Sequence, residues 1–280
     1  MGCLDIPNET VFTMEITPVK VGPGATDEVA YDLKRLGVKH PLIVTDRGVM
    51  KLGLPERVRS LLQEGGLSAD IFDDVHVEPT DKSFEAIATF VQGRDYDGFV
   101  AVGGGSSIDS AKAANLFTNY PAPVMDYVNK PIGKGLPVPG PLKPLVAIPT
   151  TAGTGSETTA MAIMDVLSLK VKTGISHRYL RPTLAIIDPL NTITLPPKAT
   201  AYPGFDVLTT RSNPTRAGRI MPVLSINRMS VRSTSEVTPS VICGARRRWN
   251  TWVAISAGLC STAWMWRRER TWHLQQPLPV

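Results

Sequence analysis

The chain has 280 residues, of which 42% are hydrophobic and 20% are charged, and this composition is that of an ordinary soluble protein. Its 3 cysteines are widely spaced and form no CxxC pair, which argues against a disulfide framework or a zinc finger. No apolar run approaches the length of a membrane span, and no signal pattern opens the sequence. We therefore expect a cytoplasmic protein, or a mitochondrial one if the source is eukaryotic.

Strands and helices alternate along the first part of the chain. In order, we expect a helix over 25–37, a strand over 41–46, a helix over 49–63, a strand over 69–75, a helix opening at Thr80 or Asp81, and a strand, turn and helix over 98–117. Alternation of this kind predicts an α/β domain with a parallel sheet.

The second part of the pattern begins with a segment rich in Pro and Gly. We expect a long loop over 121–144, strands over 144–150 and 183–189, a β-hairpin turning near Leu167–Ser168, and a helix-rich segment over 196–210. Beyond that point the composition changes. Residues 211–280 contain 11 Arg, no Lys and 2 acidic residues, whereas 1–210 contain 12 Lys and 7 Arg against 23 acidic residues. All 5 Trp lie in 211–280, which we expect to be a poorly ordered basic tail.

A glycine- and serine-rich turn follows the apolar strand in "GFVAVGGGSSIDSAKAA". Gly104 and Gly105 let the backbone approach a ligand closely, and Ser106 offers a hydroxyl at the start of the next helix. Free N–H groups and the helix dipole attract an anion there, so the turn predicts a cradle for a pyrophosphate. It is not GxGxxG and follows a late strand, so the common Rossmann fingerprint does not apply. The alternative is a tight turn with a serine cap.

A second polar turn follows the next strand in "AIPTTAGTGSETT". The hydroxyls of Thr150, Thr151 and Thr154 can hydrogen-bond a ligand at the carboxyl end of that strand. Open α/β sheets bind their ligands at this edge, and both turns are expected to lie there. The alternative is a flexible loop of small polar residues.

Two further residues are candidates for cofactor contacts. Asp46 closes the strand "LIVTD", where a carboxylate can accept both ribose hydroxyls of adenosine and would repel a 2′-phosphate. It therefore favours NAD over NADP, with a simple helix cap as the alternative. Lys172 in "LKVKTG" could neutralise a phosphate or contact a ribose, or it could be a solvated strand lysine.

One carboxylate, Asp206 in "GFDVLTT", is a candidate metal ligand. Asp and His four residues apart on a helix can bind one cation together, but the residue four positions later is Thr210. None of the four histidines has a second ligand at metal spacing: His40, His76, His177 and His273.

Several of these segments are similar to one known family. "GGGSSIDSAKAANL", "PLVAIPTTAGTGSETT" and "LPPKATAYPGFDVLT" resemble the iron-dependent (group III) alcohol dehydrogenase family. "VEPTD", "DYVNKPIGKG" and "LKVKTGISHR" are most similar to its hydroxyacid–oxoacid transhydrogenase branch. "PTTAGTGSETT" favours this family over glycerol dehydrogenase or dehydroquinate synthase, which share its fold. The likeness extends from about residue 10 to Thr209.

The resemblance implies a fold and a division into domains. The fold is a dehydroquinate-synthase-like α/β dinucleotide-binding domain with a parallel sheet, followed by an all-helical metal domain. We expect the first domain over 1–195, the start of the helical domain over 196–210, and an aberrant basic tail over 211–280 in place of the remainder. A frameshift near codons 209–211, followed by an early stop, is our hypothesis for this tail, and a genuine divergent tail is the rival.

The resemblance also implies the ligand contacts. They are Gly104, Gly105 and Ser106 to the pyrophosphate, Thr150, Thr151 and Thr154 near the nicotinamide, Lys172 on the ribose side, Asp46 to the adenosine ribose, and Asp206 to Fe²⁺ or another divalent metal. The family pattern expects His at position 210 and two more from later helices. It assigns no catalytic residue beyond the metal site.

The activity implied is metal-assisted hydride transfer between NAD and a 2-hydroxyacid, 4-hydroxybutyrate or an alcohol. The expected partners are this small-molecule substrate and a second copy of the chain in a homodimer, with no nucleic acid and no membrane. Because Thr210 breaks the ligand pattern, we expect the chain to be inactive as written. A non-catalytic NAD-binding fragment is the alternative.

Overall fold

A computed structural model describes residues 15–212, with the side chains described through Gly204 and at Val207. The tail over 211–280 thus lies outside the described residues, except for the last two positions of a helix.

Six parallel strands form the central sheet. They are β1 (Val19–Val21), β2 (Pro41–Val44), β3 (Asp70–Phe72), β4 (Gly98–Gly103), β5 (Leu145–Pro149) and β8 (Leu184–Ile187), in the spatial order β1-β8-β5-β4-β2-β3. All neighbouring pairs are parallel. β4 and β5 lie at the centre, and every residue in them is buried, as expected of strands covered on both faces. The predicted parallel α/β fold is confirmed, and β1 is an edge strand that the sequence pattern did not reveal.

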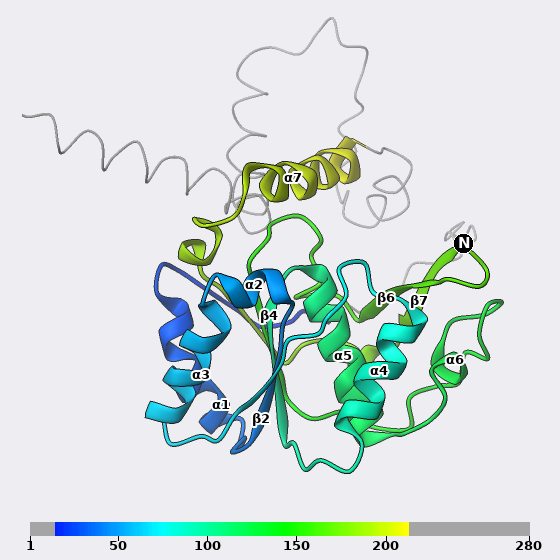
Figure 1. The fold of residues 1–280 in the computed structure, drawn as a ribbon, viewed down its shortest axis with the longest axis horizontal. Coiled ribbons are helices and arrows are strands. Elements are labelled where there is room, and N and C mark those ends of the chain that lie inside the picture. Colours follow the sequence, from blue (N-terminus) through cyan, green and yellow to red (C-terminus); the bar gives the residue numbers. More distant parts are fainter. Residues whose placement is uncertain (1–14, 213–280) are drawn as a thin grey trace, which may run out of the picture.

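Helices cover both faces of the sheet (Figure 1). One layer contains α1 (Val29–Arg35), α2 (Arg47–Lys51) and α3 (Leu54–Glu64), and the other contains α4 (Asp81–Val91) and α5 (Gly105–Asn119). Alternate residues of each strand supply the two cores: Ile43 faces α1 and α3, whereas Leu42 faces α4 and α5. The remaining helices are short or lie outside these layers: η1 (Ala25–Glu28), α6 (Val124–Tyr127), η2 (Arg178–Leu180), η3 (Pro189–Thr192) and α7 (Pro197–Ser212).

The helix predicted over 49–63 is wrong as a single element. Gly53 has a φ of 78°, a left-handed conformation that ends α2 and starts α3. Pro55 lies in the first turn of α3, where its missing N–H costs no intrahelical bond. The apolar periodicity continued across this break because both helices contribute to the same core.

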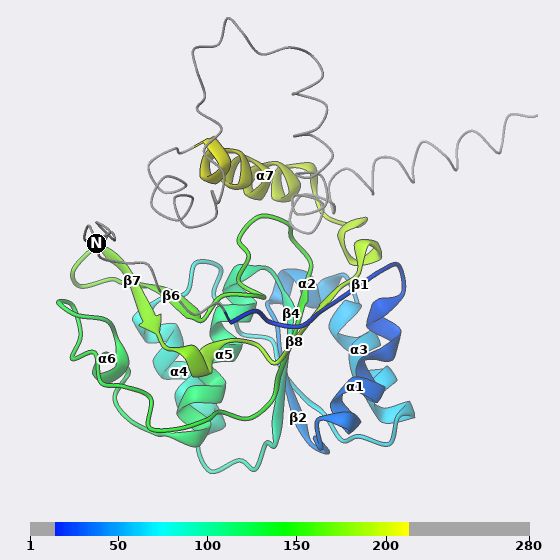
Figure 2. The same cartoon turned by 180° about the vertical axis from the view of Figure 1, so that it is seen from behind.

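The β-hairpin was predicted correctly and stands apart from the main sheet. β6 (Met161–Val166) pairs antiparallel with β7 (Val171–Ser176). β6 packs along α5, and Figure 2 shows the hairpin next to α5 and α6 from behind. The loop over 121–144 is irregular, as expected, apart from the four residues of α6. No described helix is long and apolar enough to cross a membrane.

α7 passes over the edge of the sheet where the strands end (Figure 1). A Cβ atom added at Gly153 would lie 2.3 Å from the carbonyl oxygen of Pro203, so the loop after β5 touches this helix. The segment predicted to be helix-rich over 196–210 forms α7. Through Pro203 this helix lies against the loop after β5, which is part of the candidate site described next.

Candidate functional site

The two polar turns lie side by side at the carboxyl edge of the sheet. β4 and β5 are neighbours and parallel, and the backbone N–H of Thr150 donates to the carbonyl oxygen of Gly103 at 2.9 Å. A Cβ atom added at Gly104 would lie 3.2 Å from Thr151 Oγ1, and one at Gly105 would lie 3.2 Å from the Thr154 side chain. Glycine is thus what lets the turn after β4 and the loop after β5 approach each other closely. We call these segments the glycine turn (103–106) and the threonine loop (150–160).

Gly103 has a second structural reason to be glycine. Its φ is 152°, and an added Cβ would lie 2.3 Å from Ser107 Oγ. The strand can therefore turn into α5 only without a side chain at this position.

Three helices start at this edge, directly after or shortly after β2, β3 and β4, and they differ in how they begin. Asp46 caps α2 and Thr80 caps α4, each accepting hydrogen bonds from backbone N–H groups of the first turn. The helix α5 begins at Gly105, and Gly104 at its cap position provides no side-chain cap. Its first-turn N–H groups and the positive end of its dipole therefore face the edge of the sheet, an arrangement that suits an anion.

The side chains of Ser106 and Asp46, both predicted to contact the cofactor, make hydrogen bonds within the protein. Ser106 Oγ accepts from the backbone N–H of Glu78 at 3.2 Å, and Glu78 itself has a φ of 58°. Asp46 Oδ1 accepts from the N–H groups of Gly48 and Val49, while its Oδ2 accepts from the Ser107 hydroxyl at 3.1 Å. Asp46 is thus a helix cap, the alternative considered for it, and it also joins the end of β2 to the start of α5.

The three threonines differ in their surroundings. Thr150 is 2% exposed, and its Oγ1 has no hydrogen-bond partner among the residues that the structure describes. A buried hydroxyl without a partner is unfavourable, and the hydroxyls of Thr17 and Thr45 share this condition among the described residues. Thr151 is partly buried against Gly104, and Thr154 is exposed and accepts from the Ser156 N–H at 3.4 Å.

Lys172 lies on β7 of the hairpin, outside the main sheet. Its side chain is 59% exposed, and its Nζ lies 3.8 Å from Asp165 Oδ2. Its predicted contact with a ribose stays a prediction.

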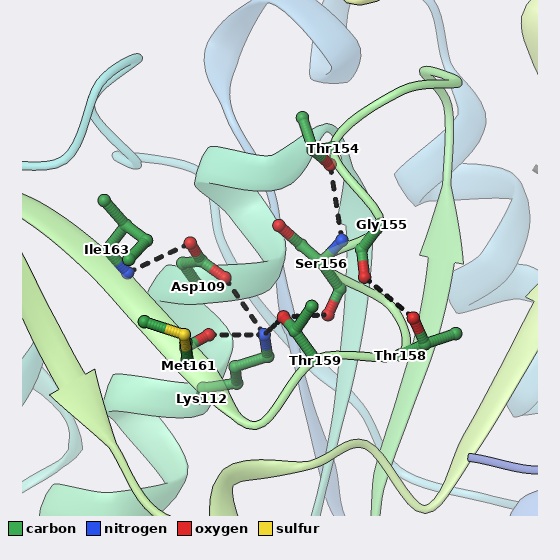
Figure 3. Close-up of polar contacts among 9 residues, drawn as sticks. All are labelled: Asp109, Lys112, Thr154, Gly155, Ser156, Thr158, Thr159, Met161 and Ile163. Carbon is green, nitrogen blue, oxygen red and sulfur yellow. Dashed lines mark hydrogen bonds and ion pairs between the residues drawn. The ribbon is translucent and has the colours of Figure 1, made fainter. Parts of the chain in front are cut away.

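A buried ion pair in α5 was not predicted from the sequence. The side chain of Lys112 is 0% exposed and that of Asp109 is 8% exposed, and Nζ lies 3.1 Å from Oδ1 (Figure 3). Burial raises the pKa of the Asp109 carboxyl, although the Lys112 ammonium opposes this shift. Burial likewise lowers the pKa of Lys112, against the effect of Asp109. The spacing of three residues on one helix was the available signal.

The described residues do not provide a metal site. Among them, no group of three or more His, Cys, Asp and Glu side chains could hold a metal ion. Asp206 lies on α7, but its side chain is outside what the structure describes, and Thr210 stands where the family pattern expects His. The side chains that the structure describes do not provide the ligands that an iron ion needs.

Known proteins resemble this chain in sequence and in fold. The mitochondrial hydroxyacid-oxoacid transhydrogenases of Mus musculus and Homo sapiens are each 48% identical to it over 198 residues, or 70% of this chain. The alignments cover 43% and 42% of those relatives, so the chain spans less than half of their length.

Solved structures show the same fold. A sulfoacetaldehyde reductase from Bifidobacterium kashiwanohense in complex with NAD⁺ matches with a TM-score of 0.65 and 29% identity, covering 71% of this chain and 52% of that one. A 1,3-propanediol oxidoreductase matches with a TM-score of 0.64 and 31% identity, covering 70% of this chain and 50% of that one.

The family follows from a match over most of the described chain. The model of the family "Iron-containing alcohol dehydrogenase" matches residues 17–189, from the segment before β1 to the end of β8, and so includes the glycine turn and the threonine loop. The family is NAD- and metal-dependent, and its α/β dinucleotide-binding fold is the one described above. The chain belongs to the iron-containing alcohol dehydrogenase family.

Proposed function

We propose that the carboxyl edge of the sheet binds NAD, with its pyrophosphate at the glycine turn. The observation that carries this proposal is the start of α5, a helix of 15 residues that lacks a side-chain cap where two neighbouring helices have one. Gly104, Gly105 and Ser106 would surround the phosphates, and the threonine loop would lie along the nicotinamide half. Thr150 Oγ1 offers a buried hydroxyl with no partner in the described structure.

Asp46 would select NAD over NADP. Its carboxylate lies at the end of β2 next to the start of α5, so a 2′-phosphate on the adenosine ribose would face a negative charge. One oxygen already accepts two backbone N–H groups, and the ribose would compete with Ser107 for the other.

In a family member with a complete metal site, the reaction would be hydride transfer between NAD and a hydroxyl-bearing carbon. The named relatives are hydroxyacid-oxoacid transhydrogenases, which supports a hydroxyacid such as 4-hydroxybutyrate as the substrate class, with alcohols second. The hydroxyl carbon would lose a hydride to the nicotinamide and its oxygen a proton, giving the aldehyde or the ketone. Residues 1–195 would form the dinucleotide-binding domain and residues 196–210 the start of the helical domain.

We further propose that the 280 residues bind NAD without turnover. The support is in the sequence: Thr210 stands four residues after Asp206, where the family pattern expects the second ligand. A single carboxylate binds a divalent cation weakly, because the ion keeps most of its water ligands.

The test is calorimetric titration of the full chain with NAD, NADP and ADP-ribose, followed by turnover assays with 4-hydroxybutyrate or 1-butanol in the presence of Fe²⁺. We expect NAD and ADP-ribose to bind, NADP to bind more weakly, and no turnover above the rate without protein. Absence of NAD binding by the folded chain would refute the site. Turnover at the rate of a full-length transhydrogenase would refute only the proposed inactivity.

A further inference from the structure

The buried pair in α5 joins three segments of the protein. Lys112 Nζ donates to Asp109 Oδ1 at 3.1 Å, to Thr159 Oγ1 at 3.2 Å and to the carbonyl oxygen of Met161 at 2.6 Å. An ammonium group has three N–H bonds, so these acceptors satisfy it completely. Asp109 Oδ2 accepts from the backbone N–H of Ile163 at 3.1 Å. Figure 3 shows these four contacts, one within α5 and three that join α5 to the end of the threonine loop and the start of β6.

These contacts fix the far end of the threonine loop. Its near end is bound to the glycine turn through the hydrogen bond from Thr150 N to Gly103 O. Between the two ends the loop has no strand or helix, and its internal bonds are short-range, such as that from Thr158 Oγ1 to Gly155 O at 3.0 Å. The Lys112 contacts with Thr159 and Met161, together with the hydrogen bond from His177 N to Ala160 O at 3.1 Å, therefore set where the loop leaves the site.

Burial of both charges points to a geometric role for the pair. Removing two charges from water costs free energy that their attraction only partly offsets, so an apolar pair of the same shape would stabilise the fold about as well. An apolar pair, however, has no directional bonds to Thr159, Met161 and Ile163. What the ion pair adds is the register of the loop and of β6 along α5.

We propose that Lys112 and Asp109 are positioning residues that hold the threonine loop against the glycine turn, so that the NAD site is formed before NAD arrives. This inference rests on the proposed function of that site. Neither residue needs to touch the cofactor, because both act through the loop that they anchor.

The experiment compares Lys112→Met, Asp109→Asn and the double variant with the unchanged full chain. Hydrogen–deuterium exchange of the ligand-free protein reports the order of residues 151–160, titration with NAD reports affinity, and thermal unfolding reports stability. We expect Lys112→Met to lower the Tm, to speed exchange in the loop, and to weaken NAD binding by about tenfold, as for a lost charge-assisted hydrogen bond.

The double variant separates positioning from stability. Because it leaves no buried charge unpaired, it should recover most of the lost Tm while the loop still exchanges quickly and NAD still binds weakly. If the double variant recovers loop protection and NAD affinity together with the Tm, the pair has no positioning role and the inference is wrong.

Two further variants serve as a matched control and as a milder test. Lys20→Met removes a partly buried lysine, paired with Asp32 and Glu28 between β1 and α1, and should leave loop exchange and NAD affinity unchanged. Thr159→Val removes one acceptor of Lys112 and keeps the ion pair, so it should speed loop exchange even if the other variants fail to fold.

Unchanged exchange in folded Thr159→Val and Lys112→Met would overturn the inference. If the unchanged chain does not bind NAD, the proposed function fails, whereas loop exchange still tests the anchor.

Discussion

The starts of α2 and α4 differ from the start of α5 in whether a side chain binds the first-turn N–H groups. At α2 and α4 the backbone N–H groups of the first turn are bound by Asp46 and by the capping box of Thr80 and Ser83. At α5 a glycine occupies the cap position, and no side chain takes that role. All three helices begin at the same edge, so the difference comes from the residue at each cap.

At the proposed NAD site, the start of α5 thus keeps N–H groups that no capping side chain binds. A helix start capped by Asp or Thr is about 1 kcal/mol more stable than one with Ala at the cap, but only a few tenths more stable than one with Gly, so α5 forgoes a small gain. Thr150 is similar, since its buried hydroxyl has no partner in the structure described. The first-turn N–H groups of α5 are bound by no side-chain cap, and an anionic ligand would supply both the negative charge and the hydrogen-bond acceptors.

The largest expected effect is at the turn itself. In Gly103→Ala the new Cβ would lie 2.7 Å from Ser107 Cβ, which rotation of the serine hydroxyl cannot relieve, in a backbone conformation that favours glycine, so α5 must shift. We expect a loss of about 2–4 kcal/mol in the free energy of unfolding, measured with urea. Gly93→Ala is the matched control, because its φ is also positive and nothing lies within 4 Å of the added atom. It should cost only about 1–2 kcal/mol, and equal losses in the two variants would contradict the steric argument.

A cap added to α5 should weaken ligand binding through its charge. Gly104 has an extended backbone that any residue can adopt, so Gly104→Asp can bind the free N–H groups and place a negative charge in the proposed pyrophosphate site. The cap favours the fold by a few tenths of a kcal/mol, but the new Cβ lies 3.2 Å from Thr151 Oγ1, so we expect a net loss of about 1 kcal/mol in stability and a fall in NAD affinity of at least about tenfold. Gly104→Asn has the same shape without the charge. If both variants bind NAD as tightly as the unchanged chain, the cradle lies elsewhere.

Changing the charge at α2 should alter selectivity more than stability. Asp46→Asn keeps a good helix cap, so the Tm should remain nearly constant, while the preference for NAD over NADP should fall several-fold because the repulsion of the 2′-phosphate is lost. Parallel titrations with the two cofactors measure this ratio. Asp46→Ala, in which the cap is lost as well, should cost about 1 kcal/mol of stability. An unchanged ratio in Asp46→Asn would show that the carboxylate serves only as a cap.

The smallest effect is expected at Thr150. Thr150→Val keeps the shape of the side chain and removes a hydroxyl that has no partner in the described structure, so the ligand-free protein should be as stable or gain up to about 1 kcal/mol. NAD affinity should fall by roughly threefold to tenfold if the hydroxyl contacts the cofactor. A loss of stability without a change in affinity would mean that the hydroxyl serves the fold.

Much of the fold could be predicted because its signals are local. Alternating strands and helices, the Thr80 cap and the hairpin are encoded in short windows of sequence, and each appears in the structure. The break at Gly53 could not be seen, because periodicity does not register a single left-handed residue between two helices that share one core. The strand β1 was missed because three residues give no alternation to detect, and only its pairing with β8 makes it a strand.

The sequence by itself determined the family, the parallel sheet, the two polar turns, and the Thr210 that interrupts the metal pattern, because each depends on residues close together in the chain. The tertiary structure decided which polar groups remain available and which are already used. Asp46 binds across to Ser107, Ser106 accepts from Glu78, and Lys112 reaches Thr159 and Met161. These contacts join residues 28 to 61 positions apart, and only the packing of α5 against its neighbours brings their atoms together.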